Sequence, residues 1–222
     1  MSLRLVLLAT LILLVPLQVF AQGDNVDRQD LMGLLETVFE LEQLPIRMRD
    51  SLMAIHGVDH EQVKTYQRLY EENHAENEKT IRTLLDSQGW PNRSEVGERG
   101  HWIIANVLQH SSNEVRIMYL PMMREEVEEG NLNPRFLARA EDRIATERGD
   151  LQVYGGQMKY YPETQTFNVW PVLDPENIDV RRAAIGLGPI ADHLRERFDF
   201  EWDLKEQIRR TREFEQSGKN ER

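Results

Sequence analysis

The sequence contains no cysteine in its 222 residues. Disulfide bonds, lipid attachment through cysteine and a cysteine nucleophile are therefore excluded. The Gly-x-Ser-x-Gly motif of serine hydrolases and a phosphate-binding glycine loop are also absent from the sequence. The fold must be stabilised by its own apolar core, and no stretch of the chain identifies a reaction.

Basic residues are in deficit. The chain has 27 lysines and arginines against 38 acidic residues, which gives a formal net charge of −11 at pH 7. An acidic surface repels polyanions. We therefore expect no nucleic-acid partner.

A long apolar run occurs only at the N-terminus. Arg4 precedes the run from Leu5 to Val15, and Ala21 provides the small residue expected before a cleavage site. This pattern predicts a secretory signal peptide over residues 1–21, with cleavage after Ala21. We expect a periplasmic or secreted protein with no membrane span in the mature chain, because no later stretch provides the roughly 20 apolar residues needed.

Apolar residues recur at helical intervals through most of the mature chain. The first such helix is expected from Asp27, with Leu31 the first residue of its apolar stripe, and Pro45 is expected to end or kink it. Asp59 is expected to cap the next helix, and Asn133 followed by Pro134 predicts the start of a later one. These patterns indicate a mainly helical protein.

The pattern changes after residue 150. Alternating side chains around the turn sequence "PETQ" predict a small β-hairpin near residues 157–171. We expect an all-α fold, an irregular bundle of about six to eight helices with this one hairpin. Residues 22–202 are expected to form a single helical domain, and residues 203–222 a charged C-terminal helix or tail.

Polar residues occupy positions that continue the apolar stripes of two predicted helices. His74 and Asn77 fill a gap in the first stripe, and His110 extends the second. A buried polar group without a partner costs about 1–3 kcal/mol. We therefore expect all three side chains to point inward and to have hydrogen-bonding partners.

The segment "LQVYGGQ", residues 151–157, follows a predicted helix that contains Asp142 and Arg143. Its two glycines permit a sharp inward turn. Gln152, Tyr154 and Gln157 could then close a structural network around His110. The same groups could instead line a ligand pocket, and the residues alone leave both interpretations open.

Several short motifs, taken in their order and spacing, resemble a known family. The motifs are "EQLPIR" (42–47), "GWPNRSEVG" (89–97), "QH" (109–110), "EDR" (141–143), "QVYGGQ" (152–157) and "VRRAAIGL" (180–187). Together they resemble the bacterial family known as domain of unknown function 6624, over roughly residues 30–195. The family pattern has Asp-Gln where Glu42 and Gln43 stand, Asp where His74 stands, and usually Thr where Gly156 stands.

The resemblance implies a set of recurrent polar positions and no established activity. The matching residues are Gln43, Arg47, Asn77, His110, Asp142, Arg143, Gln152, Tyr154, Gln157 and Arg182. This set overlaps the polar residues found from helical spacing. A family organised around such positions favours a shared pocket.

Three functions are consistent with these observations. The first is a pocket around His110 that binds a small polar or anionic ligand, with Arg47 and Arg143 supplying charge and Gln152, Tyr154 and Gln157 fixing its orientation. Gln43 and Asn77 are further candidate ligand-binding residues of this pocket. The second is a metal-independent hydrolase or lyase in which His110 is the general base and Asp142 orients it. The third is an envelope protein-interaction module whose polar network is purely structural. We expect no metal and no cofactor.

Overall fold

The computed structural model describes residues 28–220, in which eight α-helices and one two-stranded hairpin are present. The helices are α1 (Arg28–His56), α2 (Glu61–Gln88), α3 (Arg93–His110), α4 (Asn113–Glu128), α5 (Pro134–Glu147), α6 (Ile178–Ala184), α7 (Ile190–Phe198) and α8 (Leu204–Asn220). The hairpin strands are β1 (Met158–Tyr161) and β2 (Thr166–Val169), and a short 3-10 helix, η1 (Pro175–Asn177), precedes α6. The predicted fold class is confirmed. The predicted signal peptide lies outside the described residues.

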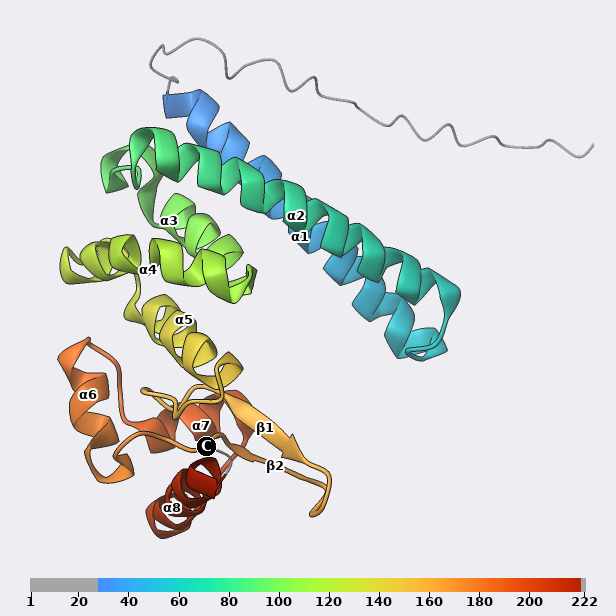
Figure 1. Cartoon of the computed structure of the whole chain (residues 1–222). Helices are drawn as coiled ribbons and strands as arrows, with labels where there is room; N and C mark the ends of the chain where they lie inside the picture. Colours follow the sequence, from blue (N-terminus) through green and yellow to red (C-terminus); the bar gives the residue numbers. More distant parts are fainter. Residues whose placement is uncertain (1–27, 221–222) are drawn as a thin grey trace, which may run out of the picture.

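Helices α1 and α2 form a long antiparallel pair that extends beyond the rest of the molecule (Figure 1). Pro45 lies within α1, and the helix continues through it. Proline has no backbone N–H, so the carbonyl of Leu41 lacks its usual helical donor. Asn73 of α2 donates its side-chain amide to that carbonyl at 2.6 Å. Of the two expected effects of Pro45, ending the helix is not observed, since α2 satisfies the freed acceptor.

Caps and glycines set the ends of several helices. Gly57, with φ +84°, follows the last residue of α1. The cap of α2 is His60, whose Nδ1 accepts the Gln62 N–H, and not Asp59 one residue earlier. The predicted start of α5 is confirmed, since Asn133 accepts the Arg135 N–H at 3.0 Å and Pro134 begins the helix.

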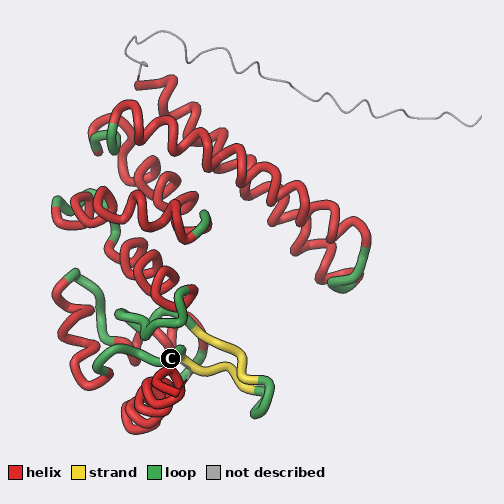
Figure 2. Tube along the Cα trace, in the orientation of Figure 1, coloured by secondary structure: helices red, strands yellow, loops and turns green. Residues whose placement is uncertain are grey.

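The apolar core has two parts. The larger part joins α1 to α5 and contains residues such as Leu35, Ile81 and Ile104. The smaller part lies around the end of β2, α6 and α7, where Val169 and Ile190 are buried. Helix α5 and the segment after it connect the two parts (Figure 2).

The charged C-terminal segment forms α8 and packs against the segment that follows β2. Thr211 accepts the Val172 N–H at 3.3 Å and donates to the Val172 carbonyl at 3.0 Å. Gln207 donates to the Trp170 carbonyl at 3.2 Å. Both polar side chains are buried, so α8 forms one wall of this end of the molecule.

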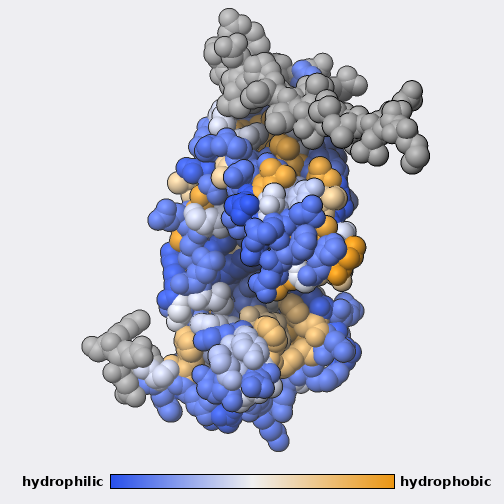
Figure 3. All heavy atoms as spheres, turned by 90° about the vertical axis from the view of Figure 1, so that its right-hand side faces the viewer, coloured by the Kyte–Doolittle hydropathy of each residue, from blue (hydrophilic) through white to orange (hydrophobic). Residues whose placement is uncertain are grey.

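The face in Figure 3 is largely hydrophilic, with apolar residues in separate patches. Within residues 28–220, no helix combines the length and the apolar character required to cross a membrane.

Candidate functional site

A buried carboxylate, Glu42, lies at the junction of α1, α2 and α3. Only 2% of its surface is exposed. His74 of α2 lies with Nδ1 2.7 Å from its Oε1, and Asn106 of α3 donates to its Oε2 at 3.2 Å. The Gln109 side chain donates in turn to the side-chain oxygen Oδ1 of Asn106 at 3.0 Å. The network joins three helices through hydrogen bonds from residues far apart in the sequence.

The predicted inward orientation of His74 and Asn77 is confirmed. Asn77 is buried and donates to the Val38 carbonyl at 2.9 Å, which ties α2 to α1. His74 contacts Glu42, and these are two of the positions at which the sequence departs from the family pattern. The buried atoms His74 Nε2 and Gln109 Oε1 have no hydrogen-bond partner within the described part of the chain. The bond from Asn77 to the Val38 carbonyl gives Asn77 a structural role in joining α2 to α1.

Replacing Glu42 by alanine is expected to lower the free energy of unfolding by about 2–3 kcal/mol, because Asn106 and His74 would lose a buried charged acceptor. Urea unfolding of the purified variant measures this loss. Glu40→Ala is the matched control, since Glu40 is exposed on the same helix and its one ion pair within residues 28–220 is with Arg47. Equal losses in the two variants would contradict a structural role for the Glu42 network.

His110 does not point into the core. It is the last residue of α3 and is exposed, while the preceding Gln109 is buried. Its Nδ1 lies 3.4 Å from Nη1 of Arg143, which also donates to the Gln109 carbonyl. Partial burial of the ring, followed by the Arg143 charge, lowers the pKa of His110 to about 4. The imidazole is therefore neutral at pH 7.

Asp142 is completely buried and holds the segment after α5. Its Oδ1 accepts the backbone N–H groups of Val153 at 2.8 Å and Tyr154 at 2.7 Å, and its Oδ2 accepts that of Gly156 at 2.7 Å. Burial raises the pKa of Asp142 to about 6, and the three donors act in the opposite direction. Within residues 28–220 no hydrogen bond joins Asp142 to His110. The expected orientation of His110 by Asp142 is therefore wrong, because both oxygens bind the loop.

The loop "LQVYGGQ" is held by a second buried side chain. Gln152 donates to the carbonyls of Gln157 at 3.1 Å and Trp170 at 2.7 Å, and it accepts the Gln157 N–H at 2.8 Å. Gly155 adopts φ +79°, a conformation that glycine tolerates best. The side-chain amide of Gln152 therefore stabilises a corner of the fold, and its hydrogen bonds are made within the protein.

The structure does not bring Gln43 and Arg47 to the other predicted site residues. Arg47 is half exposed on α1 and pairs with Glu40 at 2.9 Å. Gln43 is half-buried on the same helix. Within the described residues, no hydrogen bond or ion pair joins either side chain to Arg143 or to the loop. Their predicted contribution to a pocket around His110 is therefore not supported by the geometry.

A small hollow that includes Asp142 in its lining lies between α5, the loop, α6 and α7. We call it the arginine hollow. Its lining residues are Arg135, Ala138, Arg139, Asp142, Tyr154, Gly156, Arg182, Leu187 and His193. The buried Arg182 is fixed by bonds to the carbonyls of Gly188 at 2.7 Å and Tyr154 at 2.8 Å. The polar lining thus comes from residues that are far apart in the sequence.

Positive charge is concentrated in the arginine hollow. Arg139 is half-buried, and no carboxylate pairs with it among the described residues. Burial, followed by the charges of Arg197, Arg135 and Arg143, lowers its pKa to about 10. Burial and three arginines, including Arg182 and Arg139, lower the pKa of His193 to about 4. Asp142 is the one carboxylate in the described lining, so the hollow favours a further negative charge.

The sequence carries a signal for two of the arginines in this hollow, Arg135 and Arg139. Arg135, Arg139 and Arg143 are spaced four residues apart, which places them along one face of α5. Only Arg143 was predicted as a site residue. Arg182 was implied by the resemblance, and its position beside Arg139 depends on the tertiary fold.

The protein is mainly helical and acidic overall, and it gathers several arginines beside the loop "LQVYGGQ". Residues 57–205 match the model of a family described as "Family of unknown function (DUF6624)", and the chain belongs to that family. The resemblance inferred from short motifs is thereby confirmed. All residues that line the arginine hollow lie inside the matched segment, whereas Glu42, Gln43 and Arg47 lie outside it. No curated protein and no solved structure is significantly similar to the chain.

Proposed function

We propose that the protein binds a small anion, a phosphate or carboxylate group, in the arginine hollow. The observation that carries the proposal is the environment of Arg139, which is half-buried among other arginines with no carboxylate pairing with it in residues 28–220. The chain has 38 acidic residues against 27 basic ones, so acidic partners are plentiful elsewhere. An anion would offset the mutual repulsion of these arginines.

The chemistry of the lining suits an oxyanion. A guanidinium presents planar N–H donors that match the oxygens of phosphate and carboxylate, and such charge-assisted bonds are stronger than neutral ones. Arg182 is already fixed by two backbone carbonyls, so little of its freedom would be lost on binding. The hollow would thus act as a preorganised site.

Asp142 is the one carboxylate in the described lining of the hollow. Three backbone N–H groups already bind its two oxygens, and they offset part of its negative charge. Its role in this proposal is to hold the loop that forms one wall.

The size of the hollow limits what can enter it. The space available to small molecules is about 40 Å³, and one water occupies roughly 30 Å³ in the liquid. A single charged group would fit, with modest movement of the arginine side chains. The remainder of a larger molecule would lie outside the hollow.

The proposal predicts that Arg139→Gln weakens the binding of inorganic phosphate at least about tenfold, which corresponds to roughly 1.4 kcal/mol. Isothermal titration calorimetry at pH 7 measures the affinity, with sodium chloride held constant because exposed charges are screened by salt. Arg148→Gln is the matched control, since Arg148 is exposed just after the same helix and does not line the hollow.

Two outcomes would contradict the proposal. One is the absence of phosphate binding to the wild-type protein at millimolar concentration. The other is an equal loss of affinity in the Arg139→Gln and Arg148→Gln variants, which would indicate a general effect of charge. Circular dichroism of each variant checks that the fold is retained.

The two alternatives receive less support from the geometry. A hydrolase or lyase that uses His110 would need a carboxylate to orient the imidazole, and Arg143 occupies that place. An envelope interaction module would use exposed apolar side chains such as Ile55 and Val58, which lie at the tip of the α1 and α2 pair. That alternative stays a prediction. If the signal peptide predicted from the sequence is present, the function is exercised outside the cytoplasm.

A further inference from the structure

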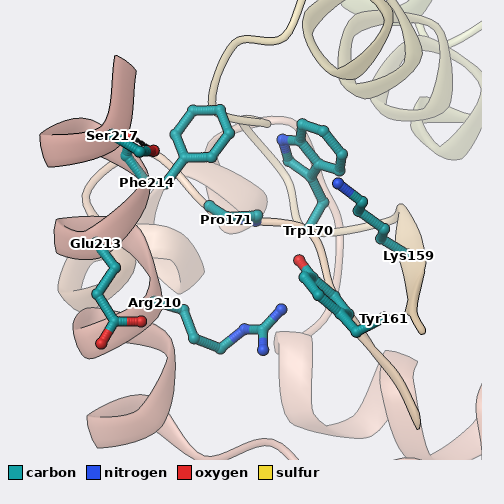
Figure 4. Close-up of a pocket in the computed structure, with 8 residues that line it drawn as sticks. All are labelled: Lys159, Tyr161, Trp170, Pro171, Arg210, Glu213, Phe214 and Ser217. Carbon is teal, nitrogen blue, oxygen red and sulfur yellow. Dashed lines mark hydrogen bonds between the residues drawn. The ribbon is translucent and has the colours of Figure 1, made fainter. Parts of the chain in front are cut away.

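A second pocket lies between the β-hairpin and α8, and its volume is about 370 Å³. Its lining residues are Lys159, Tyr161, Trp170, Pro171, Arg210, Glu213, Phe214 and Ser217. Figure 4 shows the aromatic rings and the two basic side chains around one space, contributed by the hairpin side and by α8. This volume is at the lower end of the range for small-molecule sites, roughly 300–1,000 Å³.

Two aromatic rings form a rigid wall of the pocket. Trp170 and Phe214 pack edge to face, with ring centroids 5.7 Å apart. The indole N–H of Trp170 donates to the Asp150 carbonyl at 2.8 Å, which fixes the ring. Such a wall suits a flat apolar group, because aromatic pairs add about 0.5–1.5 kcal/mol beyond the apolar area they bury.

Two cations line the pocket without an acidic partner. Lys159 Nζ lies 4.7 Å from the Trp170 ring centroid, and the Arg210 guanidinium carbon lies 4.3 Å from that of Tyr161. Neither side chain forms an ion pair within residues 28–220, and Arg210 Nε is buried with no hydrogen-bond partner there. The lining carboxylate, Glu213, pairs with Arg209 at 2.5 Å. The basic groups of the pocket are therefore available to an anion.

We propose that this pocket binds an aromatic carboxylate, a molecule with one flat ring and one carboxylate group. The ring would pack against Trp170 and Phe214, and the carboxylate would accept hydrogen bonds from Arg210 and Lys159. The pocket shares no lining residue with the arginine hollow, and Arg210 and Phe214 lie beyond the segment that matches the family.

Phenylacetate is the probe, and phenylacetamide is its neutral counterpart of nearly the same shape. Calorimetric titration of the purified protein is expected to show binding of phenylacetate and at least about tenfold weaker binding of phenylacetamide. Arg210→Gln is expected to weaken phenylacetate binding about tenfold or more. Lys159→Gln provides a second variant on the opposite wall, in case the first disturbs α8.

Arg212→Gln is the matched control, because Arg212 is exposed on the same helix and does not line the pocket. It is expected to leave the affinity unchanged. Equal affinity for the acid and the amide would overturn the proposal. So would the absence of phenylacetate binding at millimolar concentration, or an equal loss of affinity in the Arg212→Gln variant.

Discussion

Replacing Asp142 by asparagine is expected to lower the free energy of unfolding by about 3 kcal/mol or more. The carboxylate accepts three backbone N–H groups, from Val153, Tyr154 and Gly156, in a completely buried position. An asparagine amide would turn one acceptor into a donor that faces another N–H group. Loss of a buried charged acceptor costs about 1.5–3 kcal/mol for each bond, and an unsatisfied donor adds to that cost.

Urea unfolding followed by circular dichroism measures this effect, and Asp150→Asn is the control. Asp150 is exposed at the start of the same loop, and its side chain makes no hydrogen bond within residues 28–220. Its replacement is expected to change the stability by less than about 0.5 kcal/mol. A loss below about 1 kcal/mol for Asp142→Asn would show that the loop does not depend on this carboxylate.

Replacing Gln152 by alanine is expected to cost about 3 kcal/mol. The side chain is fully buried and makes three hydrogen bonds, two of them with the backbone of Gln157. After truncation the Gln157 N–H would have no acceptor, and a cavity would remain between the loop and the end of the hairpin. Both effects destabilise the folded protein.

Gln157→Ala tests whether the effect is specific to Gln152. The side chain of Gln157 forms no hydrogen bond within the described residues, although its backbone groups bind Gln152. We expect this variant to lose less than about 1 kcal/mol in thermal or urea unfolding. If Gln157→Ala were as destabilising as Gln152→Ala, the loop would be held by contacts other than those described above.

Local sequence patterns predicted most of the fold. The Asn133 and Pro134 pair marks a helix start by its own chemistry, and the "PETQ" turn between alternating residues marks the hairpin. Whether Pro45 ends α1 depends on Asn73, which lies 28 residues further along the chain and donates to the freed carbonyl of Leu41. Local patterns predict local structure. Whether a helix continues through an internal proline depends instead on the residues that pack against it.

The candidate site was harder to predict than the fold. Extending the apolar stripe of α3 to its last residue assigned the buried position to His110, whereas Gln109 occupies it. One residue in a helix is a rotation of about 100°, so an error of one position moves a side chain from the core to the surface. The environment of Arg139 requires knowing that α6 and α7 lie beside α5, which no local pattern contains.

The pKa of His193 tests the proposed anion site most directly, because the ring lines the hollow and its pKa is lowered to about 4 by burial and by neighbouring arginines. Its imidazole resonances can be followed by NMR while pH is varied, with and without sulfate, whose charge stays constant over the range. An anion bound beside the ring stabilises the imidazolium. The account predicts that sulfate raises the pKa of His193 in the wild-type protein and has little effect in the Arg139→Gln variant. An unchanged pKa at saturating sulfate, or an equal rise in both proteins, would contradict binding in the arginine hollow.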